Sequence, residues 1–176
     1  MSEQDRVSIR KLSTGVPGLD EILGGGLPEF SFNIIAGGPG TGKTTLAHQI
    51  VFANATPETP ALYFTVLGEP PLKMMRYQQL YTFFDESKIN SCIRFMNLSE
   101  IVKEKNLHAV LEEITKQVEA ASPGIVVVDS FQTVVRRPQL GTSEMELQAF
   151  VQDLALNLSG WQATTFLLGE YNDREL

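Results

Sequence analysis

The chain has 176 residues, of which 43% are hydrophobic and 20% are charged, and its formal net charge is −7. This length suits one domain with a hydrophobic core, and the acidic balance argues against tight nucleic-acid binding, which depends on clustered Lys and Arg. Cys92 is the only cysteine, so an internal disulfide is excluded, as expected for a reducing compartment.

In chain order, residues 1–13 form a polar N-terminal segment that we expect to be ordered only by packing onto the rest of the domain. This segment lacks the apolar stretch of a secretory signal. No later run approaches the ~20 apolar residues that are needed to cross a bilayer. We therefore expect a cytoplasmic protein without membrane contact, folded as a single domain over residues 1–176.

Apolar strands alternate with helical patterns along the remainder of the chain. Strands are predicted at 30–36, 61–66, 91–98, 123–130 and 163–171, and the main helices at 44–54, 72–84, 106–121 and 142–158. The periodicity of the helix at 72–84 predicts that Met75, Leu80, Phe83 and Phe84 mostly face the core. The strands are continuous apolar runs, which is typical of a parallel sheet covered by helices on both faces, so we predict an α/β fold.

A glycine-rich segment, GGPGTGKTT, follows the first strand and opens the next helix. Gly37, Gly42, Lys43 and Thr44 satisfy the P-loop pattern, in which backbone N–H groups and a helix N-terminus surround a phosphate. Lys43 would act in catalysis at the β- and γ-phosphates, and Thr44 would bind Mg²⁺. The predicted nucleotide-binding residues are Gly37, Gly38, Pro39, Gly40, Thr41, Gly42, Lys43, Thr44 and Thr45. The alternative is a plain turn between a strand and a helix.

Asp129 ends the apolar strand IVVVD, at the edge of a parallel sheet where ligands bind. We assign Asp129 to Mg²⁺ through water, and the alternative is an acid that caps a turn. Water activation needs a further group, and the candidate is Glu69, after the second strand. Glu69 is equally explained as a solvated loop acid before a helix that Pro70 and Pro71 begin.

Four segments together resemble a domain of the KaiC family, a group of RecA-like ATPases that includes clock and signalling proteins. They are LSTGVPGLDEILGGGLP, GGPGTGKTTLAHQ, ALYFTVLGEPP and IVVVDS, and the first is the most discriminating because P-loops are widely shared. The resemblance covers nearly the whole chain. It implies a RecA-like core, ATP with Mg²⁺, slow hydrolysis, and homo-oligomeric rings, often hexamers, with a possible protein signalling partner.

The chain departs from the family pattern at two places. The family usually carries two adjacent glutamates after the second strand, where this chain reads Thr65-Val66-Leu67-Gly68-Glu69. Either Glu69 substitutes for the pair, or hydrolysis is feeble. Family domains also continue beyond the fifth strand, so we expect the RecA-like core to be incomplete at its C-terminal end, and no kinase activity can be inferred.

Three functions follow from these observations. The first is a KaiC-like ATPase whose nucleotide state controls ring assembly and partner docking. The second is a relative of DNA recombinases or helicases, against which the acidic charge argues, so that nucleic acid is not an expected partner. The third is a nucleotide-gated scaffold without useful turnover.

Overall fold

A five-stranded parallel sheet forms the centre of the structure, a computed structural model that describes residues 9–65, 71–104, 107–130 and 144–170. Neighbouring strands follow the order β3-β7-β6-β4-β5, and every pair is parallel. The strands are β3 (Phe32–Gly37), β4 (Ala61–Thr65), β5 (Ile93–Asn97), β6 (Ile125–Asp129) and β7 (Thr164–Glu170). A separate antiparallel pair joins β1 (Lys11–Leu12) to β2 (Leu27–Pro28).

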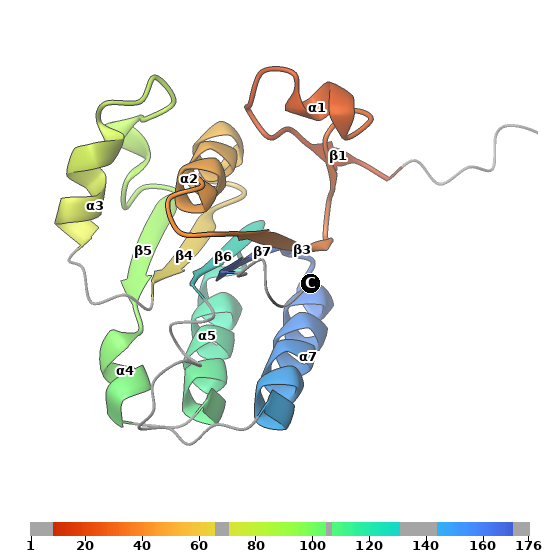
Figure 1. The fold of residues 1–176 in the computed structure, drawn as a ribbon, viewed down its shortest axis with the longest axis vertical. Helices are drawn as coiled ribbons and strands as arrows, with labels where there is room; N and C mark the ends of the chain where they lie inside the picture. The colour runs from red at the N-terminus through yellow and green to blue at the C-terminus, as the bar shows by residue number, and fades with distance from the viewer. Residues whose placement is uncertain (1–8, 66–70, 105–106, 131–143, 171–176) are drawn as a thin grey trace, which may run out of the picture.

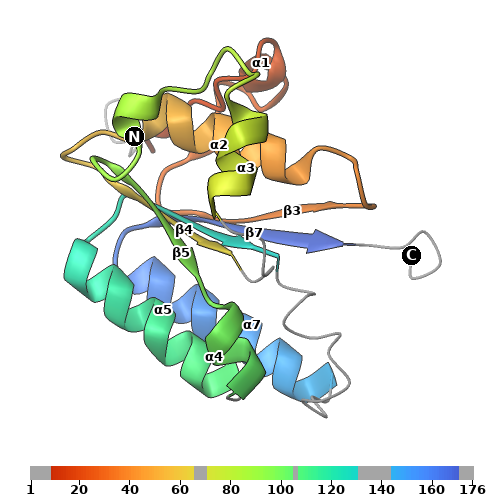
Figure 2. The same ribbon diagram turned by 90° about the vertical axis from the view of Figure 1, so that its left-hand side faces the viewer.

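Helices cover both faces of the sheet. The helices of the described residues are α1 (Leu19–Ile22), α2 (Lys43–Asn54), α3 (Pro71–Gln78), the short 3₁₀ helix η2 (Glu86–Lys88), α4 (Ser99–Glu104), α5 (Leu107–Ala121) and α7 (Glu144–Gly160), of which α1 lies beside β1 rather than on the sheet. Figure 1 shows the sheet between two sets of helices, and Figure 2 shows α2 and α3 on one face with α4, α5 and α7 on the other. The predicted α/β fold, with a parallel sheet covered on both faces, is confirmed.

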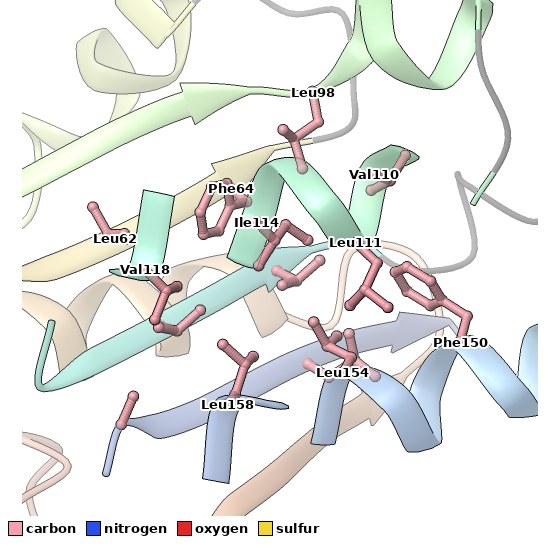
Figure 3. Close-up of a cluster of buried hydrophobic side chains, with 14 of the residues drawn as sticks. Leu62, Phe64, Leu98, Val110, Leu111, Ile114, Val118, Phe150, Leu154 and Leu158 are labelled. Carbon is pink, nitrogen blue, oxygen red and sulfur yellow. The ribbon is translucent and has the colours of Figure 1, made fainter. Parts of the chain in front are cut away.

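The core has two layers, one on each side of the sheet. All five residues of β4 are buried, and their side chains alternate between the layers. Leu62 and Phe64 belong to the layer under α5 and α7, and Figure 3 shows Phe64 beside Ile114 of α5. Tyr63 faces the other layer, which α2 covers. Burial on both sides explains why the strand sequences are apolar runs rather than alternations.

The chain at residues 13–20 is held together, and against α2, by hydrogen bonds. Ser13 Oγ donates to Asp20 Oδ2 at 2.6 Å, and the backbone N–H and hydroxyl of Thr14 donate to Oδ1 at 2.8 and 2.6 Å. These bonds, from Ser13 first and then Thr14, hold the pKa of Asp20 below its ordinary value. On α2, Gln49 Nε2 donates to Gly15 O and Asn54 Nδ2 to Ser13 O, each at 2.6 Å. Residues 13–15 are therefore fixed to the helix that follows the glycine loop.

The helix predicted at 72–84 is shorter in the structure, since α3 ends at Gln78. The chain then turns, so the expectation that Leu80 points inward is wrong, and 83% of that residue is exposed. Phe83 and Phe84 do pack inward, with ring centroids 5.9 and 5.3 Å from that of Phe52. Helical periodicity places a residue correctly only as far as the helix continues.

The other predicted boundaries lie within two residues of the observed ones, apart from the strand ends predicted at 66 and 171 and the helix starts predicted at 106 and 142, which fall outside the described residues. The pairing of β1 with β2 and the short α4 and η2 helices were not predicted. Two-residue strands and single helical turns are too short to give a periodic pattern. Among the helices that the structure describes, none is long and apolar enough to cross a membrane.

We predict that Gly26→Ala lowers the free energy of unfolding by about 1–3 kcal/mol, because a non-glycine residue is strained at positive φ. Gly26 has a φ of +112°, and a Cβ there would lie 2.4 Å from the carbonyl oxygen of Leu12 in β1. Urea denaturation followed by circular dichroism measures the loss.

Gly160→Ala is the matched control for this substitution. Gly160 ends α7, and a Cβ there would meet nothing within 4 Å, so we expect a change of at most about 0.5 kcal/mol. If Gly26→Ala is as stable as the wild type, the close approach of the β1–β2 pair does not constrain the fold.

Candidate functional site

The glycine-rich loop connects β3 to α2 at the carboxyl edge of the sheet. Gly37 is the last residue of β3, residues 38–42 form the loop, and Lys43, Thr44 and Thr45 form the first turn of α2. Gly40 and Gly42 have φ values of +76° and +90°, and a Cβ at either would meet nothing within 4 Å. Backbone conformation rather than crowding therefore requires glycine at these two positions.

The N-terminus of α2 faces this loop without a side-chain cap. Its N-cap is Gly42, which offers no capping oxygen, and the first turn carries no acidic residue. The first N–H groups of a helix lack partners within the helix and carry a partial positive charge. A loop of this shape at a helix N-terminus suits an anion such as phosphate.

Lys43 adds a full positive charge to the loop. Its Nζ donates to the carbonyl oxygens of Gly37 and Gly38 at 2.9 and 2.7 Å. The ammonium group therefore lies over the loop, within reach of an anion held there. Lysine is the residue type that contacts the β- and γ-phosphates in P-loop proteins.

Thr44 and Asp129, which are 85 positions apart in the sequence, meet in the structure. Thr44 Oγ1 donates to Asp129 Oδ2 at 2.8 Å. Asp129 ends β6, and β7 lies between β6 and the strand that leads into the loop. Only 8% of Asp129 is exposed. The two residues assigned to Mg²⁺ in the sequence thus form one cluster beside the loop.

A second hydroxyl group, that of Tyr63, contacts the same carboxylate oxygen. Tyr63 Oη donates to Asp129 Oδ2 at 2.8 Å from the neighbouring strand β4. Burial raises the pKa of Tyr63 well above its ordinary value of 10, and the negative charge and hydrogen bond of Asp129 raise it further. The phenol therefore remains a protonated donor. Sequence analysis missed this residue, although a tyrosine in a largely apolar strand is a signal, because a buried phenol needs a partner.

Thr65 supplies a further buried hydroxyl at this position. It pairs in register with Asp129, and alternation along β4 puts it on the same face as Tyr63. Thr65 is 7% exposed, and its Oγ1 has no hydrogen-bond partner within the part of the chain that the structure describes. A buried hydroxyl without a partner is costly, and a water bound to a cation would satisfy it. Hydroxyl and carboxylate oxygens are the ligands that suit hydrated Mg²⁺, so these residues fit that ion.

His48 packs against Tyr63 of this cluster, and its imidazole remains neutral. It follows Thr44 by one turn of α2, and burial lowers its pKa to about 3. Its ring lies 4.5 Å from the ring of Tyr63, centroid to centroid, and its Nε2 is 3.1 Å from Gln78 Nε2 of α3. His48 therefore acts as a packing residue under the tyrosine.

Glu69, the candidate for water activation, lies outside the described residues, in the connection 66–70. The residues on either side of that connection are defined. β4 ends at Thr65, the register partner of Asp129, and α3 begins at Pro71. Thr65, the last described residue before Glu69 in the sequence, is thus beside the predicted metal acid.

Comparison with known proteins identifies the family. A family model described as "ATPase: KaiC" matches residues 12–175. A crystal structure of a KaiC-like protein from Pyrococcus horikoshii superposes with a TM-score of 0.75 at 26% identity, covering 93% of this chain and 72% of that one.

Curated relatives match over shorter segments. UPF0273 proteins of Methanopyrus kandleri and Thermotoga maritima are 39% and 38% identical over 70 and 73 residues, which is 40% and 42% of this chain. The DNA repair protein RadA of Mycobacterium tuberculosis is 31% identical over 134 residues, or 76% of this chain. The matched segments span 27%, 30% and 25% of the lengths of these three relatives. Because the family model spans residues 12–175, with a parallel sheet and P-loop in the expected places, this chain belongs to the KaiC family of RecA-type ATPases.

Proposed function

We propose that this chain binds ATP with Mg²⁺ at the loop of residues 37–45 and hydrolyses it slowly. The observation that carries the proposal is the 2.8 Å hydrogen bond from Thr44 to Asp129, formed where the uncapped N-terminus of α2 meets the glycine loop. A phosphate-binding loop, a hydroxyl and a carboxylate at this spacing are the parts that P-loop ATPases use.

Each residue of the cluster has a separate role in this proposal. The backbone N–H groups of residues 37–45 bind the phosphates, and the ammonium group of Lys43 contacts the β- and γ-phosphates. Thr44 and Asp129 hold Mg²⁺, directly through the hydroxyl and through water from the carboxylate. Mg²⁺, when bound, neutralises charge that develops on the phosphate oxygens. The chain supplies positioning and electrostatic stabilisation.

Glu69 is the proposed water-activating residue. Its support is its place in the sequence, four residues after Thr65, which pairs in register with Asp129. A carboxylate there would accept a proton from the water molecule that attacks the γ-phosphate. The leaving group is the nucleoside diphosphate, ADP. If the wild-type chain binds ATP but releases no phosphate above background, the alternative function, a nucleotide-gated scaffold without useful turnover, holds instead.

We also propose that nucleotide state governs self-assembly and docking of a signalling partner. Membership of the KaiC family supports a homo-oligomer, with a hexameric ring as the specific expectation. Sedimentation velocity with and without a non-hydrolysable ATP analogue tests this step. The assembly proposal fails if the sedimentation coefficient is the same in both conditions.

A DNA-linked activity is a second candidate, favoured by the similarity to RadA. The formal net charge of −7 opposes it, because backbone phosphates attract Lys and Arg. A mobility shift of single-stranded DNA that weakens with salt would support this candidate over the signalling function.

We predict that Lys43→Ala weakens ATP binding by about 10- to 100-fold, because a hydrogen bond to a charged group contributes about 1.5–3 kcal/mol. Fluorescence titration with a labelled ATP analogue measures the affinity. Lys116→Ala is the matched control, since its side chain is 74% exposed on α5, on the opposite face of the sheet. Equal affinity of Lys43→Ala and wild type would contradict the proposed phosphate site.

We predict that Glu69→Gln lowers steady phosphate release by about 10²- to 10⁴-fold with nucleotide affinity unchanged, since general base catalysis contributes on this scale. A coupled phosphate assay measures the rate. Glu112→Gln is the control, with a side chain that is 67% exposed on α5. Equal rates for Glu69→Gln and wild type would remove Glu69 from the mechanism.

A further inference from the structure

Asp129 is held from two directions by hydroxyl groups on different elements. Thr44 Oγ1, from α2, and Tyr63 Oη, from β4, each donate to Oδ2 at 2.8 Å. We propose that Tyr63 is a positioning residue for the metal-binding carboxylate, fixing the orientation in which Asp129 meets the hydrated ion. This inference rests on the proposed function, because it assigns a role toward the Mg²⁺ of the same site.

The position of the Tyr63 oxygen is set by packing. No part of Tyr63 is exposed, and its ring lies 4.5 Å from His48 and 5.2 Å from Phe95, centroid to centroid. Its strand, β4, is paired on both sides, with β6 and with β5. A side chain enclosed in this way cannot change rotamer without disturbing the core, so its hydroxyl is a fixed donor.

The carboxylate is the more adjustable member of the pair. The terminal torsion of an aspartate has a broad, two-fold preference, so contacts rather than intrinsic strain fix its plane. Asp129 is 8% exposed, which strengthens each hydrogen bond to its charge. A phenol donor on one oxygen therefore selects one orientation of the group. Partners of this kind around metal ligands typically affect metal affinity by about 10- to 100-fold.

The support of Tyr63 extends to α3. His48 packs on Tyr63 from α2, and Gln78 at the end of α3 contacts both ring nitrogens of His48. The helix that begins after the connection 66–70 is therefore linked, through two buried side chains, to the tyrosine that contacts Asp129. Asp129 and α3 are therefore connected through the same packed side chains.

The test is Tyr63→Phe, which keeps the buried ring and removes only the donor. The affinity of a fluorescent, non-hydrolysable ATP analogue is measured in EDTA and at increasing Mg²⁺. We expect the affinity in EDTA to match wild type, and the Mg²⁺ concentration for half-maximal tightening to rise about tenfold. Electron paramagnetic resonance of Mn²⁺ with ADP gives a direct second measure, in which the fraction of bound Mn²⁺ falls.

Phe64→Leu is the control for a purely structural effect. Phe64 neighbours Tyr63 on β4 but packs on the opposite face of the sheet, away from the Asp129 carboxylate. Replacing its ring by leucine therefore lowers the stability of the fold without changing the contacts of Asp129. We expect Phe64→Leu to lower the melting temperature and leave metal dependence at the wild-type level. The inference is overturned if Tyr63→Phe needs no more Mg²⁺ than wild type, or if Phe64→Leu changes the metal dependence equally.

The same titration separates failure of the inference from failure of the proposed function. If wild type binds the analogue and responds to Mg²⁺ while Tyr63→Phe behaves identically, only the role of Tyr63 is wrong. If wild type binds no nucleotide in either condition, the proposed function is wrong and the inference falls with it.

Discussion

The contact between the first turn of α2 and the end of β6 is the interaction on which the site depends. α2 packs on the sheet through Ala47, Ile50 and Val51, all nearly inaccessible to solvent. That packing fixes where the helix begins, and so it places Thr44 against Asp129 and the glycine loop above them both. A shift of α2 along the sheet would separate the hydroxyl from the carboxylate. The phosphate loop is thus positioned by an apolar surface several residues away from it.

The polar cluster beneath the loop is unusual for its surroundings. Tyr63, Thr65 and Asp129 project from strands whose other residues are apolar, and each is buried. Burial of a carboxylate is costly unless donors surround it, and two hydroxyls meet that need here. The hydroxyl of Thr65 has no such partner among the described residues. Concentrating polar groups at the end of a buried sheet lowers stability and is expected where a protein binds a charged ligand.

Local patterns made the loop and Asp129 predictable from the sequence. Glycines stand in the loop where the backbone needs positive φ, and Asp129 is a charged residue directly after an apolar run. A tyrosine in a buried strand signals that its hydroxyl needs a partner, but the identity of that partner could not be found in this way, because it depends on β4 lying next to β6. That order arises from long-range pairing and leaves no local signal. The extent of α3 was missed for a similar reason, since Phe83 and Phe84 continue an inward pattern after the helix has ended.

Burial of His48 makes the support of the site sensitive to acid. An unfolded histidine titrates near pH 6.5, whereas the pKa of His48 in the folded chain is about 3. The unfolded state therefore takes up a proton between these values that the folded state does not, and stability falls as pH drops below about 6.5. Because His48 packs directly on Tyr63, uptake of that proton in mild acid would be coupled to loosening of the side chain that contacts Asp129. Mild acid would then weaken the packing that holds the Tyr63 hydroxyl against Asp129.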